Sequence, residues 1–230
     1  MHPLVKVLIF FAVMAAVAVT LSSYAALSRQ AGKQPPVPEA YTKVQEVVKA
    51  AASGGRGEAR LTGSVTLSVL TLGSKRVEVR TAGQTLTYSW SRTAVTVRPG
   101  PSSPLSVTVP AYTEDPTRTL TAYGGPEEVR VEPVLLYVKA SHPEAGGTRY
   151  VLSFSYAVLS AQPSPTWTGP LGLYAYRLGD RKVVKHGLSF NAQTLVRVYV
   201  DAQLIDSFSA RDLDVEFQTD QVALYTVKEG

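Results

Sequence analysis

Histidines and late carboxylates are the residues of this sequence best suited to acid–base or metal chemistry. The histidines are His2, His142 and His186, and none has a second histidine within four positions, so a local metal-binding pair is absent. The chain has no cysteine, which excludes thiolate metal sites, disulfides and a cysteine nucleophile. No G-x-S-x-G motif marks a serine nucleophile. We expect the histidines to lie at surface turns or strand edges, and we expect no catalytic residues and no enzymatic activity.

Three carboxylates near the end of the chain alternate with apolar residues. Asp212, Asp214 and Glu216 would share one face of a strand, because successive side chains point to opposite faces. Such oxygens suit a hard cation such as Ca²⁺, yet no D-x-[DN]-x-[DN]-G loop is present. The alternation already explains them as the solvated face of a strand. We therefore expect no metal and no cofactor.

The aromatic stretch PTWTGPLGLYAYRLGD is the best candidate for a binding site. Tyr174 and Tyr176 share one face of a predicted strand, and Trp167 lies on the Pro/Gly-rich segment before it. Exposed rings could form a platform for a glycan or a protein partner; the alternative is that they are ordinary core and rim residues. Trp167, Tyr174 and Tyr176 form the predicted partner-binding patch.

Alternation of apolar and polar residues predicts strands throughout residues 58–230. Further strands are predicted at 63–72, 75–81, 93–98, 104–109, 128–139, 194–200 and 221–228. Gly- and Pro-rich turns separate these segments, and no long helix follows them, which favours an antiparallel β-sandwich. The Pro/Gly-rich stretch 99–126 is either a boundary between two β subdomains or a crossover within one sandwich. The clearest apolar faces are Leu86, Tyr88 and Trp90; Tyr150, Leu152, Phe154, Tyr156 and Val158; and Leu213, Val215 and Phe217.

A linker and a short helix are predicted before the β region, within residues 28–57. Three prolines within 35–38 favour an extended spacer. Residues 39–52 then place Tyr41, Val44, Val47 and Val48 on one stripe of an amphipathic helix. Glycines within 53–57 end this helix and are interpreted as linker.

The N-terminal segment 1–27 is predicted to be a membrane anchor or a signal peptide. No charged residue occurs from Val7 to Leu27, a length of about 31 Å as a helix at about 1.5 Å per residue, which matches a bilayer core. The strongly apolar part ends at Val19 and is followed by a polar stretch with Ser23 and Ala25 at peptidase positions. The two alternatives are retention in the membrane through residues 7–27 and secretion after cleavage behind Ala25. Both place the β domain outside the cytoplasm.

Composition restricts the partners of the chain. The net charge of +5 is modest, and no dense basic run is interleaved with aromatics, so no nucleic-acid partner is expected. Asn191 is the only asparagine, and Met14 is the only methionine besides Met1, a scarcity seen in hyperthermophile proteins and also in GC-rich genomes.

The sequence therefore predicts a non-enzymatic cell-envelope protein with an extracytoplasmic β-sandwich. One hypothesis is a structural or surface-assembly role with self-association. The alternative is a binding module or accessory subunit that presents its β surface to a glycan or protein partner.

Overall fold

The fold is defined by the residues that the structure, a computed structural model, describes. These are residues 39–61, 65–99, 105, 107–144, 147–161, 166–168 and 171–228. The predicted anchor or signal segment 1–27 and the Pro-rich residues 28–38 lie outside this range. The described residues belong to one compact unit. No helix within them is long and apolar enough to cross a membrane.

The helix α2 (Glu39–Ala52) occupies the range that its apolar spacing predicts. It buries Val44, Val47, Val48 and Ala51 along one face. Its C-terminal end is closed by a turn in which the Gly54 and Gly55 amides donate to carbonyl groups of the last turn, and Gly54 has φ of 89°, a conformation that favours glycine.

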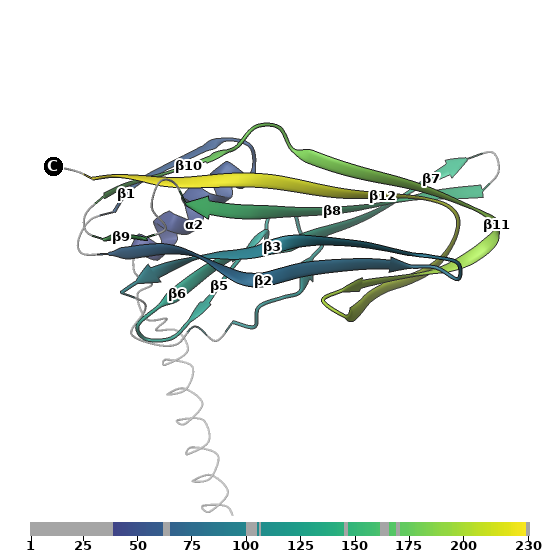
Figure 1. Ribbon diagram of the computed structural model, residues 1–230, viewed down its shortest axis with the longest axis horizontal. Helices are drawn as coiled ribbons and strands as arrows, with labels where there is room; N and C mark the ends of the chain where they lie inside the picture. Colours follow the sequence, from purple (N-terminus) through teal and green to yellow (C-terminus); the bar gives the residue numbers. More distant parts are fainter. Residues whose placement is uncertain are drawn as a thin grey trace, which may run out of the picture. The chain divides into compact units, whose positions relative to one another are not determined.

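The rest of the described chain is mainly β, and twelve strands join in one sheet of mixed orientation (Figure 1). The central order is β4-β7-β8-β12-β11-β2-β3-β6-β5, while β10 joins β1 to β12 and β9 pairs with β2. The strands are β1 (Arg56–Leu61), β2 (Thr66–Arg80), β3 (Thr85–Arg98), β4 (Tyr112–Thr113), β5 (Leu120–Gly124), β6 (Val129–Pro133), β7 (Leu135–Glu144), β8 (Gly147–Ala161), β9 (Thr166–Thr168), β10 (Leu171–Arg177), β11 (Lys182–Val200) and β12 (Gln203–Lys228).

Two pairings between the described strands are parallel, and for these the expectation of an antiparallel arrangement is wrong. β8 runs parallel to β12 from Arg149–Asp212 to Ala161–Leu224, and β4 pairs with β7 in the same sense. Alternation of side chains identifies a strand and its buried face, but it carries no information about the direction of the neighbouring strand. The connection through β9, β10 and β11 is long enough to bring β12 back parallel to β8.

Several strands are longer than predicted, and the described residues of one predicted strand do not form it. The segments predicted at 63–72 and 75–81 belong to one strand, β2, with a bulge between Thr71 and Gly73. The segment 128–139 is divided between β6 and β7. The prediction for 104–109 is wrong, because Leu105 forms only an isolated bridge with Gly124 and residues 107–109 are not in a strand.

The long strands contribute to two clusters of buried apolar residues. The α2 cluster combines the helix with residues of strands that include β1, β6 and β10. The aromatic cluster combines residues of β2, β3, β7, β8, β11 and the first half of β12. The predicted apolar faces are confirmed in the aromatic cluster, where Trp90, Phe154 and Phe217 are buried. Both clusters contain residues from before and after 99–126.

The strand β12 buries opposite faces in the two clusters. Odd-numbered residues such as Val215 and Phe217 lie in the aromatic cluster, whereas even-numbered Val222 and Leu224 lie in the α2 cluster. The change occurs at Thr219 and Asp220, two consecutive buried polar residues. Because alternate residues point to opposite faces, the interior of the protein lies on one side of β12 before this point and on the other side after it.

Candidate functional site

Three strands at the α2 end of the sheet build the candidate site. β1 and β12 flank β10, and the register places Glu58 opposite Tyr174 and Tyr174 opposite Tyr225. Arg56 lies opposite Tyr176 in the same register. Directly opposed residues of antiparallel strands share a face, so all five side chains project from the same side of the sheet.

The three tyrosine rings of this face contact one another. Tyr174 and Tyr225 are stacked, with ring centroids 5.1 Å apart and an angle of 15° between the rings. Tyr176 meets Tyr225 edge-on, with centroids 5.6 Å apart and an angle of 70°. Such pairs each contribute about 0.5–1.5 kcal/mol beyond their burial. The rings therefore hold one another in a fixed arrangement while Tyr176 remains 37% exposed.

An open pocket of about 700 Å³ lies over these rings. It is lined by the three tyrosines, Arg56 and Glu58, together with Gly57 and Ala175. Neither Arg56 nor Glu58 has a hydrogen-bond or ion-pair partner among the described residues. Aromatic walls with a few uncommitted polar groups are typical of ligand-binding pockets. We call these five side chains the tyrosine pocket.

The opposite face of the same three strands packs against α2, which fixes the position of the pocket. Leu173, Ala175 and Leu224 are buried there together with the apolar stripe of the helix. Gly57 allows β1 to approach the helix, because a Cβ at this position would lie 2.2 Å from the Val47 carbonyl oxygen. The floor of the pocket is thus supported by a packed core, not by a loop.

A second glycine, Gly172, leaves room for the Tyr174 ring. A Cβ on Gly172 would lie 3.0 Å from the edge of that ring, closer than an ordinary contact. Gly172 is buried two residues before Tyr174, on the same face of β10. The ring therefore covers the glycine backbone, an arrangement that a larger side chain would disturb.

The structure brings two of the three predicted patch residues into the tyrosine pocket. Tyr174 and Tyr176 line it, as residues two apart on one strand. Trp167 lies in β9, whose backbone pairs with β2 at Leu67, so it belongs to a different part of the sheet from β10.

Sequence reasoning missed Tyr225, Arg56 and Glu58. Tyr225 lies in the segment 221–228, which was predicted as a strand, but its neighbour β10 could not be inferred from alternation. Arg56 was assigned to the linker because of the surrounding glycines, whereas the structure places Arg56 and Gly57 in β1. The signal was present in the alternation of Arg56, Glu58 and Arg60 with Gly57 and Ala59.

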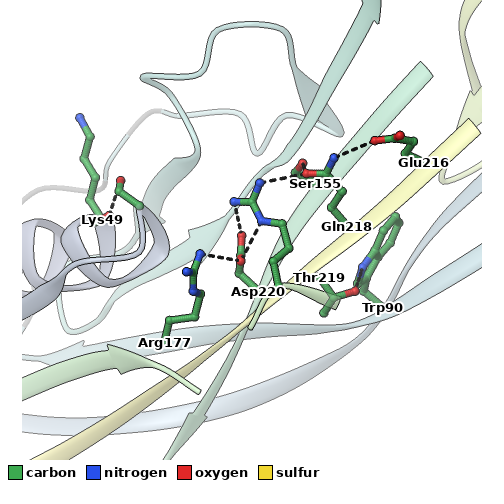
Figure 2. A network of polar contacts seen from close by, with 10 residues as sticks. Lys49, Trp90, Ser155, Arg177, Glu216, Gln218, Thr219 and Asp220 are labelled. Carbon is green, nitrogen blue, oxygen red and sulfur yellow. Dashed lines mark hydrogen bonds and ion pairs between the residues drawn. The ribbon is translucent and has the colours of Figure 1, made fainter. Parts of the chain in front are cut away.

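A polar network around the buried side chain of Asp220 is structural in character. Figure 2 shows Asp220 facing Arg177, with Gln218, Ser155 and Glu216 continuing the chain of contacts. Arg181 makes two hydrogen bonds to Asp220, of 3.0 and 2.7 Å. Since Asp220 is only 4% exposed, the two guanidinium groups neutralise a carboxylate that burial would otherwise penalise. The groups of this network are committed to one another.

A second titratable cluster joins Tyr137, Lys139 and Asp206. Tyr137 donates a 2.7 Å hydrogen bond to Asp206, and Lys139 lies 2.6 Å from the same carboxylate oxygen. Burial, then the hydrogen bond to Asp206, raises the pKa of Tyr137 above its usual value. Burial acts to raise the pKa of Asp206, but the hydrogen bonds from Lys139 and Tyr137 outweigh it and lower that pKa. The phenol stays neutral and the carboxylate stays charged, which suits a structural pair.

The predicted acidic strand face is paired with neighbouring strands. Asp214 binds Arg149 at 2.8 Å, Glu216 binds Lys185 at 2.6 Å, and Asp212 accepts from Ser189 at 2.7 Å. Across the part of the chain that the structure describes, no three His, Asp or Glu side chains converge as metal ligands would. His142 lies near the end of β7, and His186 lies in β11 with its ring 6.1 Å from that of Phe217.

Comparisons of the chain with protein-family models, curated proteins and solved structures find no match. The class of protein is therefore given by the fold: a mainly β protein with one mixed sheet, a supporting helix and an aromatic pocket.

Proposed function

We propose that this chain is a non-enzymatic protein of the cell envelope whose β domain is a binding module or accessory subunit. The observation that carries the proposal is the tyrosine pocket, in which three rings and two uncommitted charges lie on a face supported by a packed core. The N-terminal residues 7–27 direct this module out of the cytoplasm, either as a membrane anchor that is retained or as a signal that is removed behind Ala25. The binding partner is a glycan or a protein outside the cytoplasm.

The β-sandwich is proposed as the finer class of the fold. Two hydrogen bonds between strands that are not paired in the sheet support it. Trp90 Nε1 donates to Thr219 Oγ1 at 2.7 Å, and the Leu159 amide donates to Thr93 Oγ1 at 2.8 Å. They indicate that β3 faces β8 and β12 across a shared interior, as two layers of a sandwich do.

The location of the β domain is tested by labelling intact cells. Since the chain has no cysteine, a Ser209→Cys variant on an exposed part of β12 carries a single reactive thiol. We expect a membrane-impermeant maleimide to label it without lysis. Labelling that requires lysis would contradict the proposal. The mass of the native protein then distinguishes a retained Met1 end from a chain that starts at Ala26.

The binding role is tested by recovering envelope components with the purified full chain. We expect a Tyr174→Ala/Tyr176→Ala variant to lose the components that the unaltered protein retains. Tyr150→Ala is the matched control, because Tyr150 also contacts a ring, that of Phe208 at 4.9 Å, but lies outside the pocket. Equal recovery by all three proteins would count against the pocket.

A structural or surface-assembly role is the second candidate. Two apolar side chains, Leu195 and Leu204, are about half exposed on the β11–β12 hairpin and would suit contact between copies. Electron microscopy of the cell surface and sedimentation of the purified protein test this role. A strictly monomeric protein and a surface without filament or lattice would eliminate it.

A further inference from the structure

The tyrosine pocket combines apolar surfaces with both kinds of hydrogen-bonding group. The rings of Tyr174, Tyr176 and Tyr225 offer flat apolar area, and the hydroxyl groups of Tyr176 and Tyr225 can donate and accept. The Arg56 guanidinium supplies only donors, and the Glu58 carboxylate supplies only acceptors. A ligand that matches this lining has apolar faces and many hydroxyl groups.

The charges of the pocket argue against an ionic ligand. Arg56 and Glu58 lie on the same strand two residues apart, on the pocket face, and their formal charges cancel. A strongly anionic ligand would meet Glu58, and a cationic one would meet Arg56. A neutral ligand avoids both repulsions and can use both groups as hydrogen-bond partners.

The pocket's openness also restricts the ligand. Its walls are side chains on the face of a three-stranded segment, and Tyr176 remains partly exposed. An elongated ligand can therefore lie across the rings with its ends in solvent. The stacked pair of Tyr174 and Tyr225 is already in place without a ligand, so little ordering of these rings is needed on binding.

We infer that the tyrosine pocket binds a neutral oligosaccharide, with sugar rings laid against Tyr176 and the Tyr174–Tyr225 pair. The Arg56 guanidinium donates to sugar oxygens, and the Glu58 carboxylate accepts from sugar hydroxyls. This inference rests on the proposed function as a binding module and names the chemical class of its ligand.

The test is titration of the purified full chain with defined oligosaccharides, followed by ligand-observed NMR and calorimetry. The neutral probes are hexamers of glucose in α and β linkage, of mannose and of N-acetylglucosamine; an oligogalacturonide hexamer is the acidic probe. We expect at least one neutral hexamer to bind, and to bind at least about tenfold more tightly than the acidic one. Tyr176→Ala should weaken that binding at least about tenfold, while Tyr150→Ala should leave it unchanged.

Two further variants separate the roles of the polar groups and of the ring arrangement. Glu58→Gln keeps the size of the side chain and one hydrogen-bond acceptor, so we expect the affinity for the neutral hexamer to change by less than about fivefold. The ratio of this affinity to that for the acidic hexamer should decrease, because the negative charge is removed. Gly172→Ala adds the Cβ that would crowd the Tyr174 ring, and should weaken binding several-fold. Circular dichroism melting of each variant distinguishes a lost site from a lost fold.

Three outcomes would overturn the carbohydrate assignment. One is the absence of binding to every neutral probe by a folded protein, and another is binding that Tyr176→Ala and Tyr225→Ala both leave unchanged. The third is a pocket-dependent protein partner without any oligosaccharide binding, which would leave the proposed binding module intact and replace only its ligand. If the pocket variants recover the same envelope components as the unaltered protein, the proposed function itself is contradicted.

Discussion

The two halves of β12 differ in what their outward side chains contact. In its first half the outward residues Asp214 and Glu216 are carboxylates paired with Arg149 and Lys185 on neighbouring strands. In its second half the outward residue Tyr225 lies among rings and beside charges that have no partner in the described chain. Paired charges hold strands together, whereas charges that lack a partner next to exposed rings remain available for a ligand. We therefore propose that the first half of β12 contributes mainly to stability and that the second half contributes to binding.

The largest expected effect comes from the interior face of the first half. Phe217→Ala removes a buried ring that stacks with Tyr88 at 4.8 Å and Phe154 at 5.5 Å, and should lower the free energy of unfolding by about 3–5 kcal/mol. Chemical denaturation measures this loss. If the two halves differ as proposed, the folded variant keeps the ligand affinity of the tyrosine pocket.

Leu224→Ala is the matched change in the second half. It also removes a buried side chain and should cost about 2–5 kcal/mol, but it lies next to Tyr225 on the strand that carries the pocket. We expect it to weaken ligand binding as well as stability. Equal effects of Phe217→Ala and Leu224→Ala on binding would contradict the division between the halves.

The next effect concerns the point where β12 changes its buried face. Asp220→Ala leaves Arg177 and Arg181 without their shared carboxylate, and we expect a loss of about 2–4 kcal/mol, reduced from a fully buried pair because both arginines are partly exposed. Thermal unfolding measures the difference. Glu216→Ala breaks the more exposed pair with Lys185 and should cost less than about 1 kcal/mol. Similar losses for both variants would mean that the position of Asp220 has no special importance.

Alternation of apolar and polar residues was sufficient to predict the buried face in the first half of β12. It was insufficient to predict how the strand continues into the second half. The inward face of the first half follows from Leu213, Val215 and Phe217, and the structure confirms that all three are buried. The regular pattern breaks at Thr219 and Asp220, where two consecutive residues are buried, so the sequence did not indicate one continuous strand to Lys228.

The candidate site was predictable only within a single strand. Tyr174 and Tyr176 share a face because they are two residues apart, and that spacing is visible in the sequence. Tyr225, Arg56 and Glu58 join them through the pairing of β10 with β12 and β1, over distances along the chain that no local pattern encodes. Trp167 was grouped with the tyrosines because it is close in sequence, but β9 pairs with another strand.

Lowering the pH is expected to have a smaller effect on the free energy of unfolding, through Asp206 in the first half of β12. Because the folded pKa of Asp206 is lowered below its ordinary value of 3.8, its contribution to stability is complete above that value and is lost as the pH falls through the folded pKa. Unfolding free energies measured from pH 6 downward should therefore decrease on the acid side. Asp206→Asn should reduce this dependence and cost about 1–2 kcal/mol at neutral pH through the pair with Lys139.

Tyr137→Phe sharpens the acid prediction. It removes one of the hydrogen bonds that lower the pKa of Asp206 and keeps the ring in the aromatic cluster. The acid dependence should become shallower than in the unaltered protein and steeper than in Asp206→Asn. An acid dependence that neither variant changes would place its origin elsewhere, for example at Glu128, whose pKa is also lowered because hydrogen bonds from Arg130 and Arg98 outweigh the opposing effect of burial.

The smallest expected effect is an increase in the free energy of unfolding, caused by a substitution in the hairpin where β12 begins. Asp201 and Ala202 connect β11 to β12 with φ of 49° and 68°, and a Cβ makes this conformation unfavourable at Ala202. The turn is retained because Asp201 accepts from the Arg76 amide at 2.8 Å and binds Lys75 at 2.8 Å. Ala202→Gly should raise the free energy of unfolding by about 0.5–1 kcal/mol. Ala140→Gly, within β7, is the control and should lower the free energy of unfolding by a similar amount. If both variants are less stable than the unaltered protein, the backbone conformation of Ala202 does not reduce stability.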